Sequence, residues 1–226
     1  MNTSGTNSSD RQMEQVKRIY DERVAEIENY LRFVLRVVDD TNPVEGADID
    51  KDSLRKTLKA TAVLVLYNLL EATVREVVQA IFDELKVRKV SYDDCSDLVK
   101  RIVLENHKKH NPSKIQAQLD EIAFDIVHKT FNSDALFSGN VDGRKIREAA
   151  KDFGFKDPST GRYPHLLTIK NARNNLAHGF ISFNDLGKDL DKTSLTAYMS
   201  QVKDVLKETI ENVEEYIKTA AYRKTA

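Results

Sequence analysis

The segment NARNNLAHGF, residues 171–180, carries side chains suited to chemistry on a phosphate ester. Histidine transfers protons near neutral pH because its ordinary pKa is about 6.5. Arginine presents a planar fork of N–H donors that matches the oxygens of a phosphate. His178 could therefore remove a hydroxyl proton, and Arg173 could stabilise the charge that develops on the phosphate. Asn174 could orient the imidazole or bind the phosphate.

A helix over about 164–180, with Pro164 in its first turn, would position these residues. At about 100° per residue, one side of this helix is apolar and has Arg173 at its centre. That side consists of Leu166, Ile169, Leu176, Ala177 and Phe180, and a neighbouring side carries Asn171, Asn174 and His178 with Leu167. Burial of an arginine is costly unless the charge is paired or faces a ligand.

Charge along the chain is uneven around this helix. The net charge of −1 excludes a globally basic surface, but residues 158–184 contain no Asp or Glu. The same window holds Arg162, His165, Lys170, Arg173 and His178. A local positive field of this kind favours a phosphate-bearing ligand. Further candidates for contact with such a ligand are Lys170, Asn171, Arg144, Lys145 and Arg147, with a solvated helix face as the alternative for the last three.

The spacing of arginine and histidine is by itself a weak signal. A second pair, Arg101 and His107, occurs with five residues between them. His107 and His110 lie in the lysine-rich sequence NHKKHNPS, which indicates a solvated basic helix end, with ligand contact as the alternative.

The whole chain predicts an all-α protein. Only 8 Gly and 4 Pro interrupt 226 residues, which favours long helices. Apolar residues at spacings of three and four predict helices at about 10–38, 54–89, up to 106, from 112 or 113 to 131, 144–153, 164–180 and 192–222. Asp10 would cap the first, Asp52 or Ser53 the second, and Gly154 would close the helix at 144–153. We expect a disordered lead-in at 1–9 and one antiparallel helical bundle at 10–226, with long first, second and last helices.

The second helix should be central, because its middle, TAVLVLYNLLEAT, is apolar on every side. Asn68 and Glu71 interrupt it on a shared face. A buried carboxylate needs a partner. Glu71 could pair with Arg173, or with Arg75 one turn later in the same helix; both alternatives remain open.

The sequence does not indicate a disulfide, a signal peptide, a membrane span, a metal site or a cofactor site. Cys95 is the single cysteine, so it is interpreted as structural and a reducing, cytoplasmic compartment is expected. The polar N-terminus is not a signal peptide, and no run of about 18 apolar residues predicts a membrane span. No cluster with metal-ligand spacing and no Gly-rich phosphate loop occurs, so neither a metal nor a cofactor is expected.

The segment LTIKNARNNLAHGF resembles the signature helix of the HEPN superfamily, whose ribonucleases carry Arg, four to six residues, and then His. LVLYNLLEATVREV and VDGRKIREAAKDFGF resemble segments of its MAE-type branch, so the likeness covers about residues 55–220. The resemblance implies a HEPN-type helical bundle that acts as a dimer. HEPN toxins silenced by a nucleotidyltransferase carry Tyr two residues after the His. Phe180 at this position has no hydroxyl to modify, so that regulation is not expected.

These observations lead to one hypothesis with two alternatives. The hypothesis is a metal-independent endoribonuclease of toxin or phage-defence type, with Arg173 and His178 as catalytic residues and Asn174 and Glu71 as supporting ones. A two-fold homodimer would supply two His178 side chains, one as base and one as acid. Its partners would be RNA and a cognate antitoxin protein. The alternatives are a non-catalytic HEPN-like module that binds RNA or a partner protein, and a purely structural dimer in which Arg173 is buried in a salt bridge.

Overall fold

The computed structural model describes residues 8–38, 50–108, 140–158 and 163–224, without the side chains of 8–10 and 106–108. Its helices are α1 (Ser8–Val38), α2 (Lys51–Val87), the short 3₁₀ helix η1 (Tyr92–Asp94), α3 (Asp97–Lys108), α7 (Gly143–Phe153), α8 (Pro164–Ala177), α9 (Phe183–Lys188) and α10 (Lys192–Lys218). No strand occurs within these ranges, so the expected all-α fold is confirmed for them. The helix expected from 112 or 113 to 131 lies outside the described residues, as do 1–7 of the expected lead-in, whereas Ser8 and Ser9 already belong to α1.

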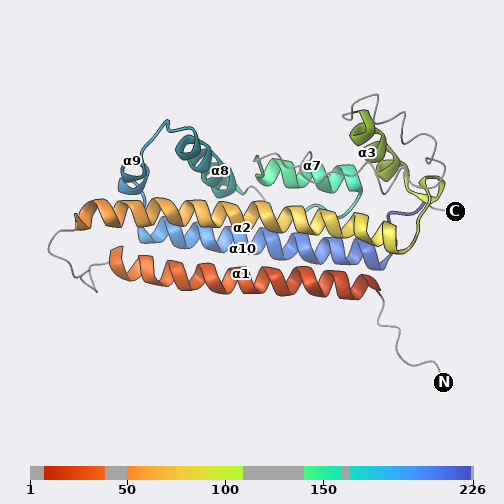
Figure 1. The fold of residues 1–226 in the computed structure, drawn as a ribbon, viewed down its shortest axis with the longest axis horizontal. Coiled ribbons are helices and arrows are strands. Elements are labelled where there is room, and N and C mark those ends of the chain that lie inside the picture. Colours follow the sequence, from red (N-terminus) through yellow and green to blue (C-terminus); the bar gives the residue numbers. More distant parts are fainter. Residues whose placement is uncertain (1–7, 39–49, 109–139, 159–162, 225–226) are drawn as a thin grey trace, which may run out of the picture.

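Three long helices, α1, α2 and α10, form the body of the protein (Figure 1). α1 runs antiparallel to the other two, as expected for the bundle. α2 and α10 run in the same direction, because the chain between them returns along the bundle through α3, α7, α8 and α9 (Figure 1). These shorter helices lie along α2, and α8 and α9 contact it directly. The motif helix is therefore supported by the most deeply buried helix.

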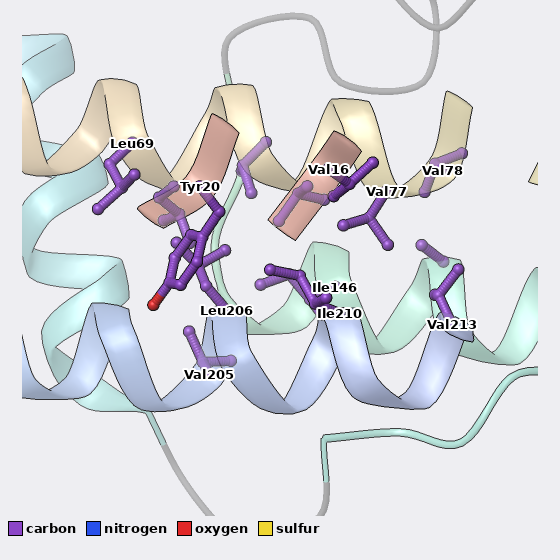
Figure 2. Close-up of a cluster of buried hydrophobic side chains, with 14 of the residues drawn as sticks. Val16, Tyr20, Leu69, Val77, Val78, Ile146, Val205, Leu206, Ile210 and Val213 are labelled. Atoms are coloured by element: carbon purple, nitrogen blue, oxygen red, sulfur yellow. The ribbon is translucent and has the colours of Figure 1, made fainter. Parts of the chain in front are cut away.

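α2 is the centre of the hydrophobic core. It packs against α1, α8, α9 and α10. Figure 2 shows Val16 and Tyr20 from α1, Val77 from α2, Ile146 from α7 and Ile210 from α10 gathered in one cluster. By length and composition alone, α2 is the one helix in the described ranges that could cross a membrane. No such helix was predicted from the sequence. Half of its apolar window is buried inside the protein, which is the packing of a core helix.

The cap of α2 lies earlier than predicted. Asp50, rather than Asp52 or Ser53, occupies the N-cap, and its carboxylate accepts the Ser53 N–H at 3.0 Å. Asp142 caps α7 in the same way, and Gly154 ends that helix with a φ of +89°. The left-handed conformation at Gly154 agrees with the predicted stop after Phe153.

Cys95 is buried, and its thiol donates to the Ser91 carbonyl at 3.3 Å. Burial raises the pKa of this thiol to about 11. A thiol that stays protonated is a poor nucleophile. The structural interpretation of Cys95 therefore fits its surroundings.

The short helix α9 was not predicted from the sequence. A capping box starts it: the Ser182 hydroxyl accepts the Asp185 N–H, and the Asp185 carboxylate accepts the Ser182 N–H. α9 packs on the start of α2 so closely that a Cβ at Gly187 would lie 2.0 Å from the Lys56 carbonyl oxygen. Glycine is thus required at this contact.

Gly187→Ala should destabilise the protein by about 1–3 kcal/mol, because the backbone of α9 must move away from α2 to accommodate the methyl group. Equilibrium denaturation by urea measures this change. Gly143→Ala is the matched control, since a Cβ there meets ordinary contacts at 3.5 Å. Equal stabilities of the two variants would show that the close contact with Lys56 does not constrain α9.

Candidate active site

The motif helix α8 packs one side against the core and exposes the other. Leu166, Ile169 and Ala172 are buried, whereas Leu167 is exposed. The α8 helix contacts α2 and α10. Pro164 occupies its first turn, as predicted. The helix ends at Ala177, three residues before the expected boundary.

A tight turn ends α8 and determines where His178 lies. The Gly179 N–H donates to the Leu176 carbonyl at 3.1 Å, and the Phe180 N–H donates to the Asn175 carbonyl at 2.8 Å. Gly179 has a φ of +69°, so this is a Schellman motif with glycine in the left-handed position. His178 is therefore the C-cap residue and is exposed.

The imidazole of His178 lies beside an exposed aromatic ring. Its centroid is 5.6 Å from that of Phe180, with the ring planes 32° apart. Phe180 is 75% exposed, the most exposed large apolar residue among those described. Both rings are therefore accessible to a ligand or to a second subunit.

Arg173 lies on the packed side of α8, as the helical arrangement predicted, and is half-buried. Its Cζ lies 5.0 Å from the centre of the Tyr67 ring on α2, a cation–π contact. Its Nη1 donates to the Asn174 Oδ1 at 3.0 Å. In the described part of the chain Arg173 makes no ion pair, so its closest partners are a neutral ring and a neutral amide.

Asn174 contacts Arg173 rather than the imidazole. Its Oδ1 accepts from Arg173, and its Nδ2 donates to Asn140 at 3.2 Å. Its backbone carbonyl accepts the His178 N–H at 3.0 Å, which is an ordinary helical bond. The Asn174 side chain therefore does not contact the imidazole, contrary to one of the sequence-based predictions. It orients the guanidinium of Arg173 instead.

Lys170 is engaged in a buried ion pair. Its ammonium lies 2.5 Å from the Asp142 carboxylate, with the two side chains 14% and 5% exposed. Burial raises the pKa of Asp142, but the hydrogen bonds from Lys170 and from the Lys145 N–H outweigh it, so the pKa is lowered overall. The predicted role of Lys170 in binding RNA is therefore corrected, because its charge is neutralised and shielded from solvent.

Glu71 pairs with Arg75. Their Oε1 and Nη2 atoms are 2.9 Å apart, one turn apart on α2. No direct ion pair joins Glu71 to Arg173 among the described residues. Of the two alternatives left open by the sequence, the intrahelical pair is the one formed.

The other predicted contacts lie on solvated surfaces. Arg144 and Lys145 both pair with Glu148, at 3.2 and 2.8 Å, and Arg147 is exposed on the same helix. Asn171 is exposed on α8. Arg101, from the second arginine–histidine pair, contacts Asp152 at 3.4 Å, while the side chain of His107 and all of His110 lie outside the described residues.

The window without acids is partly compensated in space. Asp142 neutralises Lys170, and Glu208 from α10 accepts the Tyr163 hydroxyl at 3.2 Å. Arg173 and His178, in the C-terminal half of this window, have no acidic partner among the described residues. Within the described ranges, no three His, Cys, Asp or Glu side chains form a group that could bind a metal ion.

Three surface grooves lie away from this pair. A groove of about 500 Å³ separates α1 from α10 and includes Leu31 and Met199. Grooves of about 370 and 320 Å³ follow α2 around Asn68. Neither Arg173 nor His178 lines these three, so in one chain both lie outside them.

An all-α bundle with arginine and histidine five residues apart at the end of a core-packed helix has the features of a HEPN domain. The family model described as HEPN_MAE_28990:/-like HEPN matches residues 14–222, and the chain belongs to this family. No curated protein and no solved structure gave a significant match. Family membership associates the chain with a function related to RNA.

Three residues around Arg173 were missed in the sequence. Tyr67 stood in an apolar run where an aromatic ring is ordinary core material. Asn140 and Asp142 come just before the helix predicted at 144–153, where polar residues are ordinary. Their spacing to the motif in sequence is about thirty residues, so only the fold brings them to α8.

Proposed function

We propose that the protein is a metal-independent endoribonuclease of toxin or phage-defence type. The observation that carries the proposal is the environment of Arg173: a half-buried guanidinium whose closest partners are the Tyr67 ring and the Asn174 amide. Desolvation of a charge without a counter-charge is costly. A phosphate would supply the missing negative charge and accept the remaining N–H donors. Cytoplasmic RNA is the substrate, and a cognate antitoxin protein is the partner that would restrain it.

The positions of Arg173 and His178 favour a site shared by two chains. They are five positions apart along the chain, which corresponds to about 140° around the helix axis. Arg173 faces α2, and His178 lies exposed beyond the last helical residue. A two-fold axis near the end of α8 would place a second His178 opposite the first. The exposed Leu167 and Phe180 provide apolar surface around such an axis.

The reaction requires only these groups and the RNA. One His178 removes the proton of a 2′-hydroxyl, and the oxygen attacks the adjacent phosphorus. Arg173 stabilises the additional negative charge on the phosphate oxygens. The bond from phosphorus to the 5′-oxygen breaks, and the second His178 donates a proton to that oxygen. The products are a 2′,3′-cyclic phosphate and a 5′-hydroxyl.

Cleavage should therefore proceed in EDTA and leave these two termini. The test incubates the purified protein with a mixed RNA pool in chelator and maps both ends of the fragments. DNA of the same sequence should remain intact because it lacks the 2′-hydroxyl. Loss of cleavage in EDTA, or products with 5′-phosphates, would exclude the mechanism. RNA binding with no cleavage under any condition would instead support a non-catalytic binding module.

A further inference from the structure

Tyr67 is a buried tyrosine at the centre of the contacts that surround the motif. It lies on α2 and has no exposed surface. The face of its ring contacts the guanidinium of Arg173, with 5.0 Å between Cζ and the ring centre. This contact fixes one face of the guanidinium and leaves its edges, where the N–H donors lie, for other partners.

The hydroxyl of Tyr67 has two further partners. It accepts the backbone N–H of Val141 at 3.1 Å, a hydrogen bond buried between α2 and the segment that leads into α7. Its second partner is electrostatic, because the negative charge of Glu71, one turn away on α2, acts on the phenol. Burial is the largest cause that raises the pKa of Tyr67 to about 12, and Glu71 raises it further while Arg173 lowers it. The phenol therefore stays protonated.

The segment 140–142 makes one contact with α2 and two with α8. Val141 donates to Tyr67, Asn140 accepts from Asn174, and Asp142 pairs with Lys170. Asn174 in turn accepts from Arg173. The guanidinium is thus oriented from two sides, by the Tyr67 ring on its face and by the Asn174 amide on one edge.

We propose that Tyr67 is the positioning residue of Arg173, so that its ring orients the guanidinium for phosphate and its hydroxyl holds the ring against the segment before α7. The proposal rests on the ribonuclease function proposed above. A carboxylate in the place of the ring would neutralise the arginine, whereas an aromatic face orients the cation and leaves its charge available to a phosphate.

The first test is spectroscopic and does not depend on activity. Protons above the face of an aromatic ring are shifted upfield in NMR spectra. The Nε–H and Cδ protons of Arg173, assigned by comparison with Arg173→Lys, should show this shift in the wild-type protein and in Tyr67→Phe. Tyr67→Leu should abolish it. Unshifted Arg173 protons in the wild-type protein would overturn the proposal even if neither Tyr67 variant folds.

The second test is kinetic. Tyr67→Leu should lower kcat by up to about 10²-fold, because a misplaced group fails to meet the transition state. KM should change little, since the lost interaction is made in the transition state. Tyr67→Phe retains the ring and should restore most of kcat. Tyr30→Phe is the matched control for loss of a tyrosine hydroxyl, because Tyr30 donates to the Leu58 carbonyl on the other side of α2.

The two proposals fail in different ways. A wild-type protein that cleaves no RNA but shows the upfield shift would contradict the ribonuclease function and leave Tyr67 as the residue that orients Arg173. Cleavage by folded Tyr67→Leu at the wild-type rate, or equal losses in Tyr67→Leu and Tyr30→Phe, would contradict the positioning role and leave the ribonuclease function in place.

Discussion

His178→Ala and Arg173→Ala should each reduce RNA cleavage in chelator by about 10²–10⁴-fold and leave the protein folded. His178 is exposed at the C-cap of α8, so removal of its ring leaves no cavity. Arg173 makes no ion pair within the described residues, and its loss leaves no buried carboxylate without a partner. Initial rates with a defined single-stranded RNA, together with circular dichroism and molar mass in solution, measure both parts of the expectation.

Arg101→Ala is the matched control for loss of an arginine. Its side chain is half exposed and contacts Asp152 at the surface, so cleavage and folding should be unaffected. A folded His178→Ala variant that cleaves at the wild-type rate would remove His178 from the site altogether.

Mixed dimers extend this test to the shared site. A dimer of one wild-type and one His178→Ala chain, purified through two different tags, has only one of the two imidazoles. If one site uses both as base and acid, this dimer should cleave far below half the wild-type rate. A rate of one half would show that each chain carries an independent site.

Lys170→Ala should lower the free energy of unfolding by about 3–5 kcal/mol, more than the loss of a charge from an exposed ion pair. The substitution leaves the Asp142 carboxylate, 5% exposed, without its ammonium partner. Asp142 also caps α7, so the loss should loosen the contact between α7 and α8. Urea denaturation measures the change. Glu148→Gln, which breaks exposed pairs with Arg144 and Lys145, is the control and should cost less than about 1 kcal/mol.

The stability contributed by the ion pair of Asp142 and Lys170 should decrease at low pH. The pKa of Asp142 in the folded protein lies below its ordinary value of 3.8. The carboxylate therefore contributes stability above this value, and the contribution is lost as pH falls through the folded pKa. Asp142→Asn keeps the cap but removes the charge. The difference in unfolding free energy between wild type and Asp142→Asn should shrink below about pH 3.8; a difference that does not change with pH would show that the charge of Asp142 does not contribute.

The sequence predicted those elements that have strong local signals. The heptad-like stripes of α1 and α10 and the all-apolar middle of α2 gave their positions to within a few residues. Gly154 marked the end of α7 because a left-handed residue there has few alternatives to glycine. In contrast, α9 is six residues long, too short to show a period, and it is stabilised by contact with α2 rather than by its own propensity.

The sequence pointed to the residues of the candidate site, but it predicted the contacts between them less well. Arg173 and its placement on the packed side followed from the spacing along α8. The sequence did not predict which side chains contact Arg173. Glu71 could pair with Arg173 or with Arg75, and only the pair with Arg75 forms within a single helix without any tertiary contact. Lys170 looked available for the same reason: its partner Asp142 is distant in sequence, and only the fold brings the two charges together.

The Schellman turn after α8 places the two proposed catalytic side chains in regions of different local stability. Arg173 lies within a turn packed on α2, where exchange of backbone amide hydrogens requires large-scale opening. The amides of His178, Gly179 and Phe180 are bonded only within the last turn, which opens at a much lower free energy. Opening of this turn would therefore let the backbone of His178 rotate and change the direction of the imidazole at small energetic cost, while the guanidinium stays in place. If the proposed function holds, His178, which would transfer the proton, can adapt to a bound substrate, whereas Arg173, which would bind the phosphate, is in place before the substrate arrives.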